Sequence, residues 1–272
     1  MRPETRRWEA RVRRLATRRY REQEGVCYVE GIRPVLDALE SGLSVEALLV
    51  SPELLRSEVA QRMVHEQQGA GTLVVEFARA SFEQFSDRDN PMGLAAIVRW
   101  SPLSLESLPA GPDALVVMAE EMRDPGNLGT LLRTMDAIGG TGVAVVGSST
   151  DPTHPKCLKA SMGTIFRVPL ARAASVEAFV QWAKARHIWT IATTARRGAS
   201  FWSLEYRRPL ALLLGNEGEG LRPETIQMAD VVARIPMWGT ASSLNVSVAA
   251  GALLYEIRRQ ETAGAERSPG GC

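Results

Sequence analysis

The sequence predicts an α/β protein with two domains. Short apolar runs alternate with stretches of helical periodicity along the chain, as in sheets flanked by helices. The stretch 101–112 interrupts this alternation with three prolines and marks a domain boundary. We therefore expect a small α/β domain at 1–100, a linker at 101–112 and a larger α/β domain at 113–260. Residues 261–272, which end in glycine, serine and proline, are expected to form a disordered tail.

The composition is that of an ordinary globular protein. The chain has 272 residues, of which 45% are hydrophobic and 23% charged, and its formal net charge is +1. Cys27, Cys157 and Cys272 are scattered and odd in number, so they fit neither a disulfide framework nor a zinc site. No apolar run reaches membrane-spanning length, and no apolar segment of the secretory kind opens the chain. We expect a cytoplasmic protein with no metal and no membrane partner.

The first domain is predicted to alternate helices with short strands. A basic helix at 6–22, with Trp8, Val12 and Leu15 on one face, precedes a strand at 26–29. The remaining elements are, in order, a helix at 32–39, a strand at 47–50, a helix at 52–67, a strand at 72–75, a helix at 80–85 and a strand at 94–98.

Arginine is concentrated at the start of this domain. Residues 1–33 contain ten arginines and only five glutamates. Such a local basic patch is a plausible surface for phosphate groups. The alternative is a solvated helix whose arginines and glutamates pair with one another. The sequence leaves both interpretations open.

The second domain is predicted to contain a mostly parallel sheet. Five apolar runs alternate with helices, at 115–119, 143–146, 189–193, 210–214 and 231–235. Ligands of such sheets bind beyond the carboxyl ends of the strands. Four candidate loops follow strands in this way, at 119–127, 193–198, 215–221 and 236–245, so we expect them to meet at one edge.

Two of these loops have an unusual composition. The loop 215–221 is rich in glycine but has neither a following Gly-Lys-Ser/Thr nor a GxGxxG spacing, so it is not a known phosphate loop. Its glycines allow a ligand to lie against the backbone, although Glu217 could also be a simple surface acid. A helix begins after the second loop, and Ser242 or Ser243 is placed to cap it. The small residues at 249–252 allow another backbone to come close.

Three stretches resemble the signatures of one family. They are DPGNLGTLLRTMDAIG at 124–139, LLLGNEGEGL at 212–221 and IPMWGTASSLNVSVAAG at 235–251. Together they are similar to the three signatures of the SPOUT-superfamily RNA 2′-O-ribose methyltransferases of the TrmH/SpoU type. Residues 28–39, YVEGIRPVLDAL, resemble the start of the ribosomal-protein-like RNA-binding domain that precedes many members. NPMG at 90–93 departs from the TPQG usual there, which puts the RNA contacts of that loop in doubt.

The resemblance implies a fold, an activity and partners. It implies a SPOUT domain with a deep trefoil knot, S-adenosylmethionine as the cofactor, a homodimer, and transfer of methyl groups to ribose in structured RNA. Ribosomal RNA is favoured over transfer RNA because this domain layout is commoner among the ribosomal enzymes. The alternatives are a transfer RNA 2′-O-methyltransferase and a non-catalytic RNA-binding or assembly protein on the same scaffold.

The resemblance also assigns residues to the site. The catalytic set is Asn127, Arg133, Glu217, Ser243 and Asn245. Cofactor binding is expected from Thr193, Leu214, Gly215, Asn216, Gly218, Ile235, Met237, Ser243 and Leu244, largely through main-chain groups. RNA binding is expected from Arg11, Arg14, Arg18 and Arg33 of the basic patch, and from Lys156 and Lys159, for which simple solvation at the surface is an equal alternative. Arg133 either loses its proton locally and acts as a base or stays cationic and stabilises the developing alkoxide; the second version is preferred, since arginine is a very poor base.

Overall fold

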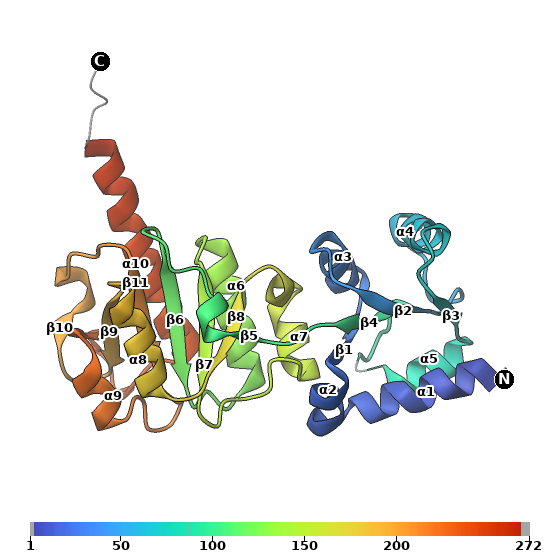
Figure 1. Ribbon diagram of the computed structural model, residues 1–272, viewed down its shortest axis with the longest axis horizontal. Coiled ribbons are helices and arrows are strands. Elements are labelled where there is room, and N and C mark those ends of the chain that lie inside the picture. Colours follow the sequence, from blue (N-terminus) through green and yellow to red (C-terminus); the bar gives the residue numbers. More distant parts are fainter. Residues whose placement is uncertain (1–2, 87, 268–272) are drawn as a thin grey trace, which may run out of the picture. The chain divides into compact units, whose positions relative to one another are not determined.

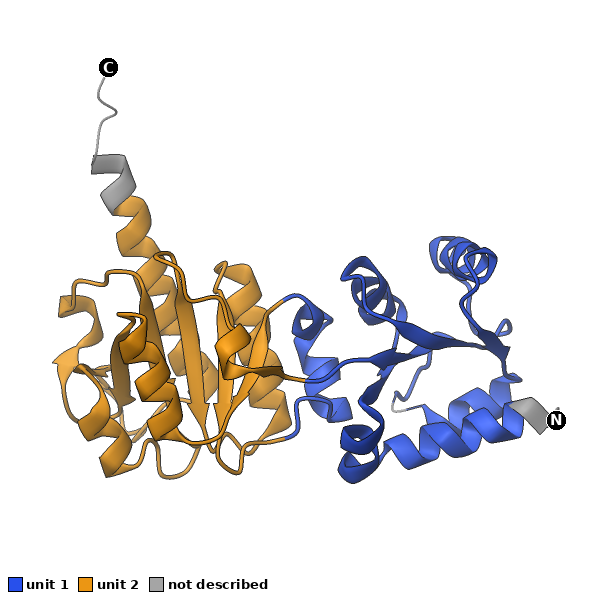
Figure 2. Ribbon diagram, viewed as in Figure 1, with its two compact units in different colours: residues 1–101, 151–167 blue, residues 102–150, 168–272 orange. Residues whose placement is uncertain are grey.

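The computed structural model describes residues 3–86 and 88–267. The chain forms two compact units, and Figure 2 shows them in different colours. Unit 1 consists of Met1–Ser101 and Asp151–Arg167, and unit 2 consists of Pro102–Thr150 and Val168–Cys272. The segment 151–167 lies within the predicted second domain, but it clusters with the N-terminal unit.

Unit 1 is built around a four-stranded sheet with the order β1-β4-β2-β3. β4 is antiparallel to both β1 and β2, whereas β3 is parallel to β2. In chain order (Figure 1) the elements are α1 (Pro3–Leu15), α2 (Arg18–Glu24), β1 (Val26–Glu30), α3 (Ile32–Glu40), β2 (Val45–Val50), α4 (Glu58–Gly69), β3 (Val74–Glu76), α5 (Arg79–Phe85), β4 (Leu94–Arg99) and α7 (Pro155–Ser161). Its core includes the aromatic side chains of Phe77, Phe82 and Phe85.

The single basic helix predicted at 6–22 is two helices, and Arg21 explains the break. Its guanidinium donates to the carbonyl oxygens of Leu15 (2.6 Å) and Ala16 (2.9 Å), at the C-terminal end of α1. These carbonyls have no partner within the helix, so the arginine satisfies them. The prediction of one continuous helix was therefore wrong, and the alternative of a solvated helix does not hold for Arg21, which is buried.

The segment 151–167 is attached to unit 1 by buried ionic contacts. Arg21 lies 2.5 Å from the carboxylate of Asp151, and both side chains are almost fully buried. Arg167 lies 2.5 Å from Asp37, whose side chain is fully buried. Gly163 approaches the same carboxylate so closely that a Cβ there would lie 2.0 Å from Asp37 Oδ2. The predicted domain assignment had no means of finding these contacts across the sequence.

Unit 2 contains an eight-stranded sheet with the order β10-β12-β9-β11-β6-β7-β8-β5. Neighbouring strands are parallel throughout, which confirms the predicted mostly parallel sheet. The elements are β5 (Leu103–Ser104), β6 (Leu115–Glu120), α6 (Pro125–Ala137), β7 (Gly142–Val146), β8 (Leu170–Ala173), α8 (Val176–Ala185), β9 (Trp189–Thr194), β10 (Ala199–Ser200), β11 (Leu210–Leu214), α9 (Pro223–Met228), β12 (Val231–Arg234) and α10 (Val246–Arg267). β5, β8, β10 and α9 were not predicted.

The predicted linker and tail both differ from the structure. Residues 101–112 contain the edge strand β5, and Leu105 and Leu108 are buried in the core of unit 2. The stretch is therefore part of the folded unit. The predicted disordered tail at 261–272 is helical as far as Arg267, the end of α10, and 268–272 lie outside the described residues.

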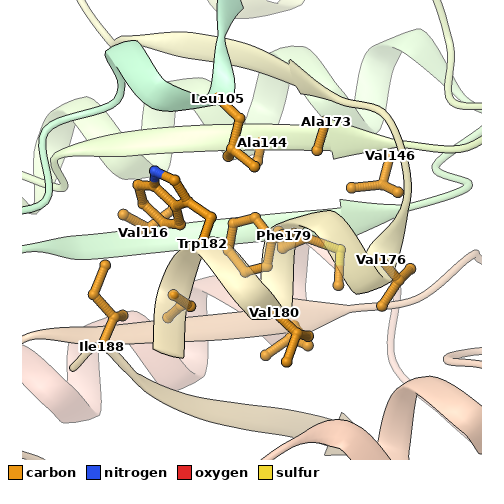
Figure 3. Packing of buried hydrophobic residues seen from close by; sticks show 14 of the residues in the cluster. Leu105, Val116, Ala144, Val146, Ala173, Val176, Phe179, Val180, Trp182 and Ile188 are labelled. Atoms are coloured by element: carbon orange, nitrogen blue, oxygen red, sulfur yellow. The ribbon is translucent and has the colours of Figure 1, made fainter. Parts of the chain in front are cut away.

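The core of unit 2 fixes the sheet against its helices. Alternate residues of the strands point to one face, where they pack against Phe179 and Trp182 of α8 (Figure 3). α10 packs against α6, and a Cβ added to Gly251 would lie 4.0 Å from the methyl carbon of Thr134. In the part of the chain that the structure describes, no helix is long and apolar enough to cross a membrane, and no three His, Cys, Asp or Glu side chains form a metal-binding group.

Candidate active site

A pocket of about 670 Å³ opens at the carboxyl ends of the strands of unit 2. The four loops that follow β6, β9, β11 and β12 start from strands that are neighbours in the order β12-β9-β11-β6. The last three of these loops line the pocket, and the loop after β6 reaches them through hydrogen bonds. All nine residues predicted to bind the cofactor line it: Thr193, Leu214, Gly215, Asn216, Gly218, Ile235, Met237, Ser243 and Leu244.

The glycine loop after β11 folds tightly on itself. The Oδ1 atom of Asn216 accepts hydrogen bonds from the N–H groups of Gly218 (2.8 Å) and Glu219 (3.0 Å). A Cβ on Gly215 would lie 2.0 Å from the backbone carbon of Gly220, so no larger residue fits there without moving the loop. Gly220 itself has a φ of 75°, a conformation that favours glycine. The turn therefore presents backbone to the pocket.

Glu217 connects the glycine loop to the start of α6. One carboxylate oxygen accepts from the N–H of Asp124 (3.1 Å) and from Nδ2 of Asn127 (2.9 Å), and the other accepts from the N–H of Arg123 (3.3 Å). Partial burial acts to raise the pKa of this carboxyl, but the hydrogen bonds from Asn127 and from backbone N–H groups outweigh it and hold the pKa below its usual range. Glu217 is thus an ionised acceptor that connects the glycine loop to the start of α6, and it is not an unbonded surface acid.

Asn127 extends the connection to the third signature. Its Oδ1 atom accepts from Nδ2 of Asn245 (3.0 Å) and from the hydroxyl of Ser247 (3.2 Å). Asn245 in turn accepts from the N–H of Ser247 (2.9 Å) and caps α10. The prediction that Ser242 or Ser243 caps this helix was therefore wrong. Three signatures distant in sequence meet in one network, Glu217–Asn127–Asn245–Ser247.

Ser247 is the member of this network that sequence reasoning missed. It is buried and it bonds both asparagines, but a serine in the first turn of a helix is typically solvated or bonded to its own backbone. Its position within the third signature, at 235–251, was the one feature of the sequence that could have marked it as a site residue.

The remaining predicted catalytic residues lie apart from the network. Ser243 is exposed and lines the pocket wall. Arg133 is exposed on α6, does not line the pocket, and its guanidinium makes no hydrogen bond or ion pair within residues 3–86 and 88–267. Asn127 and Arg133 are six residues apart on α6, so they point in different directions around that helix. The fold of one chain alone does not bring Arg133 to the pocket.

The predicted RNA-binding residues all belong to unit 1, and several have partners. Arg11 pairs with Glu46 at 2.5 Å, Arg18 with Glu22 at 2.8 Å, and Arg33 with Asp37 at 2.7 Å. The guanidinium of Arg14 lies 4.0 Å from the ring centroid of Tyr20. The paired alternative therefore describes Arg18, whose partner lies one turn along α2, whereas the closest partner of Arg11 lies on β2.

Lys156 and Lys159 have a different setting within unit 1. Both are exposed and line a pocket of about 320 Å³, which Arg88 and His154 also line. The hollow thus gathers four basic side chains more compactly than helix α1 does, with the carboxylate of Glu30 also in its lining. Arg88 and His154 were not predicted, because they are far apart in sequence and neither belongs to a basic run.

The fold and the pocket place the chain among the α/β proteins that bind a ligand at the edge of a parallel sheet. Unit 2 has a parallel sheet with a backbone-lined ligand pocket at its carboxyl edge, and unit 1 carries a basic surface. Residues 114–255 match the model of the SpoU rRNA methylase family, and residues 10–96 match that of the MRM3-like substrate binding domain. The chain belongs to the SpoU rRNA methylase family, which confirms the family predicted from the three signatures.

Relatives with assigned activities cover nearly the whole chain. A 23S rRNA (uridine(2479)-2′-O)-methyltransferase from Streptomyces viridochromogenes is 30% identical over 92% of this chain and 88% of its own length. A 23S rRNA (guanosine(2553)-2′-O)-methyltransferase, RlmP, from Bacillus subtilis is 28% identical over 90% of this chain and 94% of its own. The crystal structure of the SpoU methyltransferase AviRb from Streptomyces viridochromogenes, in complex with the cofactor AdoMet, matches with a TM-score of 0.86 and 30% identity, covering 97% of this chain and 99% of that one.

Proposed function

We propose that this chain is an S-adenosylmethionine-dependent methyltransferase that modifies the ribose 2′-hydroxyl of ribosomal RNA. The observation that carries the proposal is the pocket at the strand ends, where the three family signatures meet through Glu217, Asn127 and Asn245. The two curated relatives are named for 2′-O-methylation of 23S rRNA, but of different nucleotides, a uridine and a guanosine. The target nucleotide of this chain does not follow from them.

The pocket suits S-adenosylmethionine. Its lining combines main chain at Leu214, Gly215 and Gly218 with apolar side chains at Ile235 and Met237, so adenine would meet an apolar wall and backbone groups at its edge. When bound, S-adenosylmethionine supplies an electrophilic methyl carbon, which bonds to the ribose oxygen as its bond to sulfur breaks. Glu217 and Asn127 hold the loops that form the walls.

The cofactor site can be tested at Gly215. Adding a Cβ there forces the glycine loop to move, because it would overlap the backbone of Gly220 and Leu221. We expect Gly215→Ala to weaken binding of S-adenosylmethionine at least about tenfold by calorimetry, that is about 1.4 kcal/mol. Gly111→Ala is the matched control, since nothing lies within 4 Å of the Cβ it would add. Equal affinities in both variants would contradict the assignment of the pocket.

The chemistry is proposed to depend on Arg133. The ribose hydroxyl must lose its proton as its oxygen attacks, and a nearby cation stabilises the resulting negative charge. Arg133 is exposed and has no partner among the described residues, so its guanidinium is available to RNA. Since it does not line the pocket of its own chain, we propose that a second subunit or the bound RNA brings it to the reacting ribose.

Two substitutions separate the roles of Arg133. Arg133→Ala should lower the rate of methyl transfer by at least about 100-fold while S-adenosylmethionine still binds, since an electrostatic contact of this kind contributes about 2.7–4 kcal/mol. Arg133→Lys keeps the charge and should retain part of the rate. Near-normal turnover by Arg133→Ala in a single-turnover assay would rule this role out.

We also propose that unit 1 holds the RNA. Its supports are the match to a substrate binding domain and the basic hollow lined by Arg88, His154, Lys156 and Lys159. Lys156→Glu combined with Lys159→Glu should weaken RNA binding and reduce its salt dependence. Deletion of residues 1–100 is a poor test, because 151–167 would lose the unit against which they pack.

A homodimer in the cytoplasm completes the proposal. α10 exposes Val248 and Tyr255, seven residues apart on one face, and Leu244 precedes them. Such an apolar stripe suits a second copy of the chain, which would also account for the position of Arg133. A light-scattering mass near that of one 29.7 kDa chain at micromolar concentration would contradict the dimer.

A further inference from the structure

Three aromatic rings form a stack beside the pocket of unit 2. The ring centroids of Phe201 and Trp202 are 4.6 Å apart, and those of Trp202 and Trp238 are 5.6 Å apart with an angle of 20° between the planes. Exposure rises along the stack, from 7% for Phe201 to 49% for Trp202 and 80% for Trp238. The stack is therefore anchored at one end and open at the other.

The sheet dictates this arrangement. β10 and β12 run parallel with Ser200 opposite Arg234, so both strands deliver their next residues to the same edge. Trp202 follows Ser200 by two residues, and Trp238 follows Arg234 by four. The hydroxyl of Tyr206 donates to the carbonyl of Phe201 at 2.6 Å and fixes the buried end.

The stack adjoins the proposed cofactor pocket along the chain, and two arginines line that pocket. Ile235 and Met237, just before Trp238, line that pocket together with Arg196 and Arg197. Both arginines are exposed, and their guanidinium groups make no hydrogen bond or ion pair to any residue in the ranges 3–86 and 88–267. The pocket lining also includes the carboxylates of Glu217 and Glu219, of which Glu217 is taken up by hydrogen bonds to Asn127 and backbone N–H groups. An exposed aromatic stack that follows a pocket lined by these two arginines suits a ligand that is both aromatic and anionic.

We propose that the Phe201–Trp202–Trp238 stack is a platform on which an unpaired base of the RNA substrate stacks, next to the ribose to be methylated. The inference rests on the proposed function and specifies how the substrate is held. Single-stranded bases are recognised by stacking on aromatic side chains, and the phosphates on either side are held by arginine. The outer face of Trp238 provides the ring, and Arg196 and Arg197 provide the charge. A platform of this kind requires the target to be in a loop, a bulge or an opened helix.

The alternative occupant is a second copy of this chain. The observations favour RNA, because the pocket next to the stack is lined by Arg196 and Arg197, whose guanidinium groups are unpaired within the described residues and suit an anionic partner better than a second copy of the same cationic face. By contrast, the stretch of α10 between its exposed apolar residues Val248 and Tyr255 contains no charged residue, as suits a contact between identical subunits.

The test compares the affinity of the protein for a strand with bases and for a strand that has only the sugar-phosphate backbone. The probes are a fluorescein-labelled 12-nucleotide oligoadenylate and an abasic strand of the same length, and binding to the full chain is measured by fluorescence anisotropy. We expect Trp238→Ala to weaken binding of oligoadenylate by about 5- to 150-fold, the loss typical of one stacked base, and to leave the abasic strand unaffected. Trp238→Phe should restore most of the affinity. Leu103→Ala, which truncates an exposed apolar residue on the opposite edge strand β5, should change neither.

Other outcomes overturn the platform. They are an equal loss for both strands, no loss for either, no dependence on bases in the unsubstituted protein, or a fall in the light-scattering mass of Trp238→Ala. S-adenosylmethionine binding and methyl transfer to ribosomal RNA are measured separately in the unsubstituted protein. If the unsubstituted protein binds S-adenosylmethionine and methylates ribosomal RNA while Trp238→Ala binds oligoadenylate as tightly as it does, the platform is wrong and the proposed function stands. If cofactor binding and methyl transfer fail while base-dependent binding requires Trp238, the proposed function is wrong and the platform stands.

Discussion

Glu217 in unit 2 and Asp151 in unit 1 are both carboxylates held ionised by hydrogen bonds, but their surroundings differ. Burial acts to raise the pKa of each, and donors outweigh it, so both pKa values lie below the usual range. The donors to Asp151 are the cationic Arg21 and the neighbouring Thr153. The donors to Glu217 are neutral, namely Asn127 and backbone N–H groups.

The difference in surroundings suggests a structural role for Asp151 and a role at the pocket for Glu217. The Arg21–Asp151 pair is enclosed and joins distant segments of unit 1, so its loss leaves a buried charge without compensation. Glu217 is exposed to solvent at the pocket, and in the described part of the chain its carboxylate bonds only neutral donors on two loops. We therefore expect the first carboxylate to matter mainly for stability and the second mainly for activity.

The largest effect is expected from Arg21→Ala. It leaves Asp151 charged in a buried position and removes the donor to the carbonyls of Leu15 and Ala16, so the free energy of unfolding should fall by about 3–5 kcal/mol. Urea denaturation followed by circular dichroism measures it. Arg207→Ala is the control, because the Arg207–Glu205 pair is exposed and should contribute under about 1 kcal/mol. Similar losses in both variants would contradict the anchoring role.

A smaller effect is expected from Glu217→Gln, and it should appear in cofactor binding and not in stability. The amide retains one acceptor oxygen but loses the charge that the surrounding N–H groups stabilise. We expect binding of S-adenosylmethionine to weaken about tenfold, near the lower end for hydrogen bonds to charged groups, with little change in the free energy of unfolding. Glu224→Gln, on the exposed side of α9, should change neither. A loss of stability comparable to that of Arg21→Ala would remove the distinction between the two carboxylates.

The smallest effect is expected on the way the free energy of unfolding changes at acidic pH. Since both pKa values are lowered in the folded state, each carboxylate contributes stability that is fully present above its ordinary pKa of about 4 and is lost as the pH falls through its folded-state pKa. The free energy of unfolding should therefore decrease from about pH 5 to pH 3. This slope should be shallower in Asp151→Asn and slightly shallower in Glu217→Gln. An unchanged slope in both variants would show that neither carboxylate governs acid sensitivity.

Much of unit 2 was predictable because its strands are continuous apolar runs and its signatures follow them directly. The runs ending at Ala119 and Leu214 are fully buried central strands, which single-sequence periodicity detects well. β10 and β5 have two residues each, so no period can be recognised in them. Their positions are fixed by pairing with strands distant in sequence, which is a property of the folded sheet.

The errors in unit 1 have a different physical origin. Arg21 looks like any other arginine of a basic helix, and only the fold places Asp151 beside it. The same holds for the assignment of 151–167, which tertiary contacts decide. In the site, Asn127, Glu217 and Asn245 form one network, whereas Arg133 lies outside it, and the roles of these residues remain predictions. The trefoil knot implied by the resemblance also remains a prediction.

Analysis of the reaction product tests the central proposal most directly. The purified chain is incubated with S-adenosylmethionine carrying a labelled methyl group and with ribosomal RNA from cells that lack the gene, and the RNA is then digested to nucleosides for mass spectrometry. We predict that the label appears in a single 2′-O-methylnucleoside. Label on a nucleobase, or no label in RNA while S-adenosylmethionine binds normally, would contradict the proposal that this site methylates ribose.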